Sequence, residues 1–290
     1  MKKKIMLVTG ANSGIGQATA LEFAKQNAHV VMLCRNEEKG RIAQQQIIEE
    51  SGNNNIDLHI CDFSNLDDVR KFASIFNKTY DHLHVLVNNA AVITTKRQET
   101  KDGYELQFGV NHLAPFLLTN LLLDKMKESV PARIINVSSG AYKVGNIAFD
   151  DLQSQKKYKT FKVYGQSKLA NILFTYELAR RLEGSGVTVN CLHPGAVSTN
   201  LGVDRKTGFG KTIVRMLKPF FQTPTEGART SIYLATSDEV KGISGKYFVH
   251  QKEETTHKKT HNKEIAAKLW VVSEKLVGLD NNRTKQENSL

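Results

Sequence analysis

The segment "TGANSGIG", from Thr9 to Gly16, decides the class of fold because it joins a short apolar run to a helical pattern. Its glycines, Gly10, Gly14 and Gly16, have the spacing G-x-x-x-G-x-G. Glycines at such a turn let a pyrophosphate approach the main chain, and the N–H groups and dipole at a helix start favour an anion. An ordinary tight turn is the alternative. The position of the segment in the first strand–helix unit favours a dinucleotide site.

Outward from this segment, short apolar runs alternate with stretches of helical spacing. Seven runs read as strands: "IMLVTG", "HVVMLC", "IDLHIC", "HVLVNN", "RIINVSS", "VTVNCLHP" and "GKYFVH". Strands that are apolar along nearly their whole length and alternate with helices are typical of a buried parallel sheet. The pattern therefore predicts an α/β fold of the Rossmann type: a doubly wound parallel seven-stranded sheet with helices on both faces. Ligands of such sheets bind at the carboxyl ends of the strands.

Composition points to one domain over residues 1–290. The chain is 40% hydrophobic and 24% charged, and it has no low-complexity linker or internal repeat. Cys34, Cys61 and Cys191 are widely spaced beside apolar runs, as buried reduced thiols would be. The apolar run at the N-terminus is too short for a signal sequence, and we find no uninterrupted run of about 18 apolar residues. We expect a cytoplasmic protein without stable membrane insertion.

The net charge of +11 is spread along the chain rather than gathered in aromatic-rich basic clusters. We therefore expect no nucleic acid partner, whereas a small phosphorylated cofactor would benefit from the positive field.

The second predicted strand ends at Cys34-Arg35, with no carboxylate to receive a ribose 2′-hydroxyl. A guanidinium suits a 2′-phosphate, so NADP(H) is favoured and NAD(H) is possible. The alternative is that Arg35 only caps a loop.

Tyr164 and Lys168 are four residues apart in "YGQSKLANILF", and so share one face of a helix. A tyrosine pKa of ~10 needs about three units of lowering, roughly 4 kcal/mol, for proton exchange near pH ~7. A cation at ~5 Å supplies about 3 kcal/mol at an effective dielectric constant of ~20. The spacing alone is common on solvated helix faces. Beside a nucleotide site it indicates an acid–base pair.

With these motifs the chain resembles the short-chain dehydrogenase/reductases, nearly end to end, and within them the retinol dehydrogenase-like subset. "TGANSGIG", "CDFS", "NNAA" and "HPGAVSTNL" are similar to the cofactor-binding motifs of that family, with Ala91 in place of a usual glycine. The resemblance implies that Asp62 holds the adenine amino group and that Val197 and Thr199 lie near the carboxamide. The implied cofactor-binding residues are Gly10, Asn12, Ser13, Gly14, Ile15, Gly16, Arg35, Asp62, Phe63, Asn88, Ala90, Tyr164, Lys168, Pro194, Val197 and Thr199.

The same resemblance implies four catalytic residues, which are Asn111 in "VNHLAPFLLT", Ser139 in "INVSSG", Tyr164 and Lys168. Ser138 is the rival of Ser139, and the family pattern aligns with the second serine. In carbonyl reduction NADPH would deliver hydride to carbon while Tyr164 protonates the oxygen. Ser139 would hydrogen-bond that oxygen, Lys168 would bind ribose and lower the tyrosine pKa, and Asn111 would hold a water.

"FDDLQSQKKY" and "KLWVVSEKLVGL" resemble the retinol dehydrogenase-like subset, which implies an apolar aldehyde, ketone or retinal-like substrate and its alcohol. A basic amphipathic stretch at about 200–223 falls where the family has a substrate lid; docking on anionic lipid is the alternative. A helix is expected at about 262–278. Self-association as a dimer or tetramer is implied by the resemblance alone.

The sequence also allows two other interpretations. His82 and His84 form an H-x-H pair, but without a third ligand a surface turn is favoured, and we expect no metal site. A non-catalytic NAD(P)-binding regulatory or sensor protein is the alternative to an enzyme. Such a protein does not need the set of asparagine, serine, tyrosine and lysine, so its presence favours catalysis.

Overall fold

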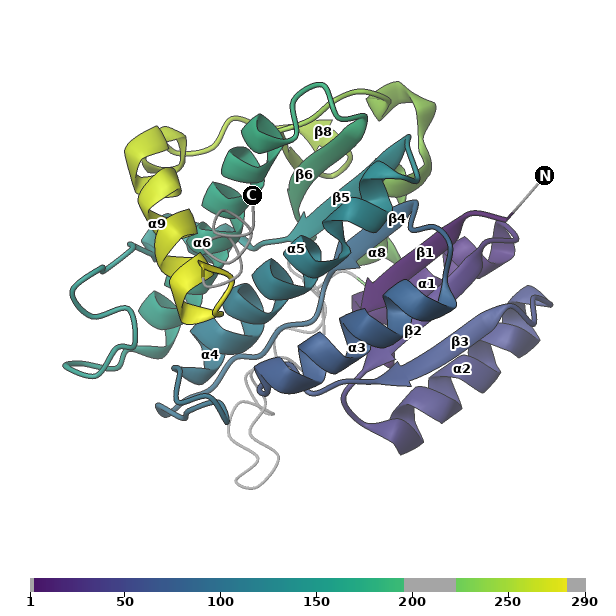
Figure 1. The fold of residues 1–290 in the computed structure, drawn as a ribbon, viewed down its shortest axis with the longest axis horizontal. Helices are drawn as coiled ribbons and strands as arrows, with labels where there is room; N and C mark the ends of the chain where they lie inside the picture. The colour runs from purple at the N-terminus through teal and green to yellow at the C-terminus, as the bar shows by residue number, and fades with distance from the viewer. Residues whose placement is uncertain (1–2, 196–222, 281–290) are drawn as a thin grey trace, which may run out of the picture.

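The strands of the computed structural model, which describes residues 3–195 and 223–280, form one twisted sheet (Figure 1). They lie in the order β3-β2-β1-β4-β5-β6-β7-β8. Their bounds are β1 Ile5–Thr9, β2 His29–Cys34, β3 Ile56–Ile60, β4 Val85–Asn88, β5 Ala132–Val137, β6 Val187–His193, β7 Tyr247–Val249 and β8 Lys252–Glu253. Strands β1 to β7 are parallel, which confirms the doubly wound sheet. The order reverses between β1 and β4, where ligands of such sheets bind.

The eighth strand was not predicted. β8 pairs antiparallel with β7 after a tight turn at His250 and Gln251, whose φ angles are 49° and 64°. Two successive residues in the left-handed region are typical of a type I′ hairpin turn, usually made by asparagine and glycine. Both residues of β8 are exposed, so no apolar run marks the strand in the sequence.

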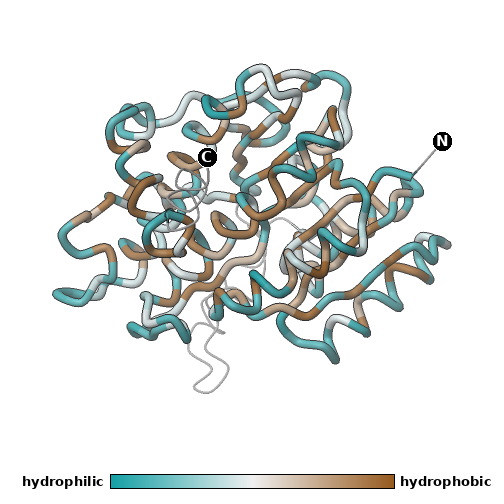
Figure 2. Tube along the Cα trace, in the orientation of Figure 1, coloured by the Kyte–Doolittle hydropathy of each residue, from teal (hydrophilic) through white to brown (hydrophobic). Residues whose placement is uncertain are grey.

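Helices cover both faces of the sheet (Figure 1). The helices are α1 Gly14–Lys25, α2 Glu37–Ser51, α3 Leu66–Thr79, α4 Leu106–Phe108, α5 Ala114–Lys127, α6 Thr160–Arg181, α8 Pro224–Thr236 and α9 Lys263–Leu276. Helices α1, α2 and α8 enclose one apolar core, and α3, α5, α6 and α9 enclose the other. Hydrophobic residues accordingly gather along the strands and the inner sides of the helices (Figure 2). The three cysteines are buried and unbonded, as expected.

One continuous stretch, Leu106–Lys127, is long and apolar enough to cross a membrane by length and composition. Most of its apolar window, 78%, is buried inside the protein, which is the behaviour of a core helix.

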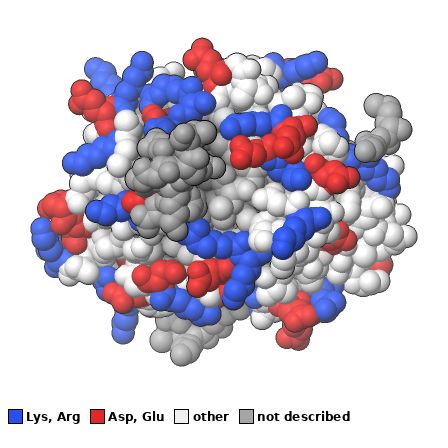
Figure 3. Space-filling model, in the orientation of Figure 1, with Lys and Arg blue, Asp and Glu red and all other residues white. Residues whose placement is uncertain are grey.

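On the face shown in Figure 3, basic and acidic side chains are interspersed rather than separated. Helix α9 occupies the place expected for a C-terminal helix, whereas the expected lid at about 200–223 lies almost wholly outside the described residues.

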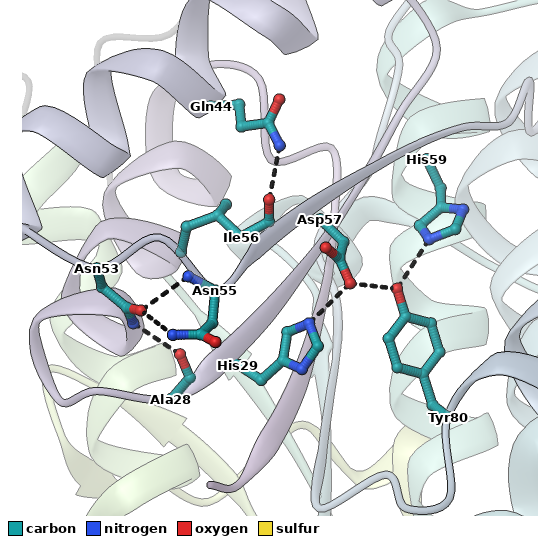
Figure 4. A network of polar contacts seen from close by, with 9 residues as sticks. All are labelled: Ala28, His29, Gln44, Asn53, Asn55, Ile56, Asp57, His59 and Tyr80. Carbon is teal, nitrogen blue, oxygen red and sulfur yellow. Dashed lines mark hydrogen bonds and ion pairs between the residues drawn. The ribbon is translucent and has the colours of Figure 1, made fainter.

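A polar network ties edge strand β3 to its neighbours (Figure 4). The Asp57 carboxylate lies 2.7 Å from His29 Nε2 and accepts a hydrogen bond of 2.7 Å from the Tyr80 hydroxyl. His59 Nε2 lies 2.9 Å from the same hydroxyl. Asn53, in the loop before β3, donates to one carbonyl in the last turn of α1 and to one just after that helix. These contacts satisfy polar side chains at the edge of the sheet.

Candidate active site

The turn between β1 and α1 has the form of a phosphate seat. Gly10 and Gly14 have φ angles of 67° and 57°, and a Cβ on Gly16 would lie 2.3 Å from the Gly10 carbonyl oxygen. The hydrogen bond from the Gln17 N–H to the Ser13 carbonyl opens the helix, so the N–H groups just before Gln17 have no intrahelical acceptor. No acidic residue stands in the first turn of α1. The geometry and charge of this turn therefore fit a pyrophosphate.

Two residues that sequence reasoning did not assign, Thr9 and Asn89, hold this turn in place. The Asn89 side chain donates to the Thr9 carbonyl over 2.8 Å, and the Thr9 hydroxyl accepts from the N–H groups of Asn89 and Ala90, each over 2.9 Å. The amide of Asn88 instead points inward to Thr119 and Asn136. Asn89 is the second asparagine of "NNAA", which was the signal for this role in the sequence. The role could be recognised only once the structure placed β1 beside this loop.

Arg35 and Asp62 occupy the carboxyl ends of β2 and β3. Arg35 is exposed, and its side chain makes no ion pair or hydrogen bond within residues 3–195 and 223–280. Asp62 uses Oδ1 to accept from Ser64, which leaves Oδ2 as an acceptor. Phe63 beside it is buried. A free guanidinium and a free carboxylate oxygen at adjacent strand ends fit the 2′-phosphate and the adenine amino group of a dinucleotide.

Helix α6 brings Tyr164 and Lys168 beside Ser139. The Ser139 side chain lies close enough to the Tyr164 hydroxyl to lower its pKa, and the Lys168 ammonium lies 5.6 Å from the tyrosine ring centroid. Lys168 also donates to the Val137 carbonyl over 3.1 Å. The neighbouring Ser138 is turned away, since its hydroxyl donates to the Lys168 carbonyl over 2.8 Å. The structure thus brings together three of the four residues expected to be catalytic.

The close approach of Gly145 to Gly165 sets this geometry. A Cβ on Gly145 would lie 2.1 Å from the Gly165 carbonyl oxygen, and a Cβ on Gly165 would lie 2.6 Å from the Ala141 carbonyl oxygen. The 3-10 helix Gly140–Val144, which Ser139 caps, therefore packs main chain to main chain against α6. Larger side chains at either glycine would separate Ser139 from Tyr164.

The pKa values of the pair differ from expectation. Burial raises the pKa of Tyr164 to about 12, and the nearby Ser139 offsets only part of that rise. Burial also lowers the pKa of Lys168 to about 8. The predicted lowering of the tyrosine pKa by Lys168 is not found in the protein itself. Excluding water destabilises the phenolate by more than the neighbouring groups stabilise it. A hydroxyl with this pKa stays protonated at neutral pH and is suited to donate a proton.

Asn111, the fourth residue, lies in a π-helical turn, Gly109–Leu113, that the sequence did not indicate. Its Oδ1 accepts from the Val92 N–H over 2.8 Å, and its Nδ2 donates to the Val92 carbonyl and the Ser167 hydroxyl. Ser167 in turn donates to the Tyr164 carbonyl over 2.8 Å. Since both side-chain donors of Asn111 are in use, a water here would have to donate to a remaining acceptor. The amide links the loop after β4 to the helix of the tyrosine.

His112 anchors the π-helical turn from the other side. Its Nε2 lies 2.9 Å from the Ser273 hydroxyl of α9, and aromatic rings of α5 and α6 surround it. Burial lowers the pKa of His112 to about 4, so it is neutral at physiological pH. The C-terminal helix therefore supports the segment that carries Asn111.

In the chain, the last predicted cofactor-binding residues follow β6 and the H-x-H pair precedes β4. Pro194 lies in the described loop after β6, whereas Val197 and Thr199 lie outside the described residues. The rings of His82 and His84 are 5.6 Å apart. Within the described ranges, no group of three or more histidine, cysteine or acidic side chains is placed to hold a metal ion.

The comparison with known proteins agrees with this geometry. The family model described as short chain dehydrogenase matches residues 4–209. The chain is 47% identical to human "Retinol dehydrogenase 14", over 96% of this chain and 88% of that protein. It is 47% identical to mouse "Retinol dehydrogenase 13", over 95% of this chain and 84% of that protein. A solved structure of an uncharacterised protein from Mycobacterium paratuberculosis is 33% identical, with a TM-score of 0.77, over 95% and 93% of the two chains.

The chain belongs to the short-chain dehydrogenase family, within its retinol dehydrogenase-like subset. Membership makes it an oxidoreductase acting on CH–OH donors, and confirms that part of the prediction.

Proposed function

We propose that the protein is a cytoplasmic NADP(H)-dependent reductase of apolar aldehydes or ketones, acting by hydride transfer with Tyr164 as the proton donor. The observation that carries the proposal is the group of Tyr164 and Lys168, both buried, with the half-buried Ser139, beside the phosphate seat. NADP(H), when bound, supplies the hydride. The side chains of Arg35 and Asp62 and the turn at Gly10 would hold it.

The protein's own residues then handle the carbonyl oxygen. Tyr164, with a pKa of about 12, would donate its proton as negative charge develops on that oxygen. Ser139 would hydrogen-bond the same oxygen and fix its approach. Lys168, which is still mostly protonated at neutral pH with a pKa of about 8, would return a proton toward the tyrosine. This direction of reaction needs no lowering of the tyrosine pKa.

An apolar substrate is supported by two exposed apolar side chains on the elements that carry the catalytic group. Phe161 lies three residues before Tyr164 on α6, and therefore on the same side of the helix, with 71% of its surface exposed. Val144, at the end of the 3-10 helix that Ser139 caps, is 60% exposed. The names of the relatives indicate that they act on retinol, which is a long apolar alcohol. We infer that this chain acts on a substrate with an apolar tail.

The first test is loss of NADPH absorbance, with NADH in parallel, against retinal, straight-chain aldehydes, aryl ketones and quinones. We expect turnover of at least one apolar carbonyl with NADPH, and weaker turnover of short polar aldehydes. Tight NADPH binding without turnover of any carbonyl would favour the alternative of a dinucleotide sensor. Failure to bind either cofactor would contradict both readings.

A second prediction concerns Arg35. Replacing it by aspartate should lower kcat/KM for NADPH by about 10- to 100-fold and raise the relative use of NADH, because a carboxylate repels the 2′-phosphate and accepts the 2′-hydroxyl. Arg41→Asp is the matched control, since Arg41 is an exposed arginine on α2 already paired with Glu37. Equal effects of the two substitutions on NADPH would show that Arg35 acts only through net charge.

A further inference from the structure

A cavity lies at the end of the sheet opposite the catalytic group. It has a volume of about 170 Å³ and is lined by Lys4, His84, Val85, Pro131, Arg133, Ala235, Asp238 and Lys241. Its floor is the amino end of neighbouring strands β1, β4 and β5, where Val85 pairs with Arg133. Tyr164 and the phosphate seat lie at the carboxyl ends of these strands. The cavity is therefore separate from the catalytic site.

The structure assigns this cavity to a small tetrahedral oxyanion, of which inorganic phosphate and the phosphate of a monoester are the representative forms. The argument rests on an excess of unpaired hydrogen-bond donors. A cavity of this size holds several waters or one such anion, because a water occupies about 30 Å³.

The first donors come from His84. The Ile5 N–H donates to its Nδ1 over 3.0 Å, so Nδ1 is the acceptor of the ring and Nε2 carries the hydrogen. Burial, with smaller contributions from His82 and Lys4, lowers the pKa of His84, which favours the neutral ring. Nε2 has no hydrogen-bond partner among the described residues. The ring therefore contributes a donor whose direction is fixed by the main chain of β1.

Arg133 is held in a similar way. Its Nη1 donates to the carbonyls of Leu234 and Ser237, over 3.0 and 2.8 Å, at the end of α8. These bonds fix the plane of the guanidinium and leave Nε and Nη2 without hydrogen-bond partners in the part of the chain that the structure describes. Because the guanidinium is already held on one edge, its side chain loses less conformational entropy when an anion binds. Its remaining donors are therefore well placed to receive an oxyanion.

Two lysines complete the lining. The side chains of Lys4 and Lys241 make no hydrogen bond or ion pair within residues 3–195 and 223–280. One carboxylate, Asp238, also lines the cavity. Burial lowers the pKa of Arg133 and the field of Asp238 opposes that lowering, but among the described residues the two form no ion pair within 4 Å. Three cations therefore face one anion, with His84 as a neutral donor. An oxyanion would supply the missing negative charge and the missing acceptors.

The test is calorimetric titration of the full chain with inorganic phosphate at constant ionic strength. We expect saturable binding that weakens about tenfold or more in Lys4→Gln/Lys241→Gln. The control Lys71→Gln/Lys78→Gln removes two exposed charges from α3 and should bind phosphate like wild type. A third variant, Arg35→Gln, should also bind normally, which separates this cavity from the cofactor site.

Three outcomes would overturn the assignment. They are no saturable binding, equal weakening in the two double variants, and loss of binding in Arg35→Gln. The unfolding temperature of each variant, measured without phosphate, identifies any loss that is due to misfolding; in that case the single variants Lys4→Gln and Lys241→Gln replace the double one. The titration does not use carbonyl turnover, so its result is independent of the proposed activity.

Discussion

Replacing Tyr164 by phenylalanine should lower kcat by about 10³-fold and leave the dissociation constant of the cofactor within about twofold. The change removes one hydroxyl from a side chain that is only 8% exposed and keeps the ring over which the Lys168 ammonium lies at 5.6 Å. The change removes the proposed proton donor to the substrate oxygen, which Ser139 is not expected to replace. Steady-state turnover with the best carbonyl and equilibrium titration with NADPH measure the two quantities.

Tyr176→Phe is the matched control for this variant. Tyr176 lies on the same helix, and its hydroxyl bonds to Thr256 over 2.9 Å, so its loss should affect stability slightly and turnover hardly at all. Retention of full turnover by Tyr164→Phe would show that another group donates the proton. A parallel loss of cofactor binding would show that the hydroxyl serves binding rather than proton transfer.

Lys168→Met should stabilise the fold at neutral pH and abolish most turnover. Burial lowers the pKa of Lys168 from 10.5 to about 8, so at pH 7 the folded protein carries a buried charge that the unfolded chain keeps in water. A difference of about 2.5 units corresponds to roughly 3 kcal/mol. Loss of the hydrogen bond to Val137 reduces this gain in stability by about 1 kcal/mol. We expect a net gain of about 2 kcal/mol in the free energy of unfolding.

The sign of the pH dependence makes this prediction specific. Between pH 8 and 10.5 the unfolded lysine still binds its proton while the folded one has released it, so the stability of the wild type rises with pH across that window. The advantage of Lys168→Met should therefore be greatest below pH 8 and shrink toward pH 10.5. Denaturant unfolding at the two ends measures it. A methionine variant less stable than wild type at pH 7 would contradict the idea that the charge is kept for function at the expense of stability.

Much of the architecture could be predicted from short stretches of sequence. The parallel sheet follows from apolar runs that alternate with helices, and the phosphate seat follows from Gly10, Gly14 and Gly16, because these are local patterns with one geometric solution. The antiparallel β8 was missed, since it has two exposed residues and a turn made by His250 and Gln251 without glycine or asparagine. The pairing of Tyr164 with Lys168 was visible because helical spacing alone puts them on one face.

The sequence by itself determined which chemical groups the protein has and on which kind of element each one stands. Only the tertiary structure decided the environment of those groups. The π-helical turn around Asn111, the contact of Gly145 with Gly165 and the raised pKa of Tyr164 all depend on segments far apart in the chain. Periodicity and motif spacing act over a few residues, whereas burial and the fields of neighbouring groups are sums over everything that packs nearby, so no single stretch of sequence contains them.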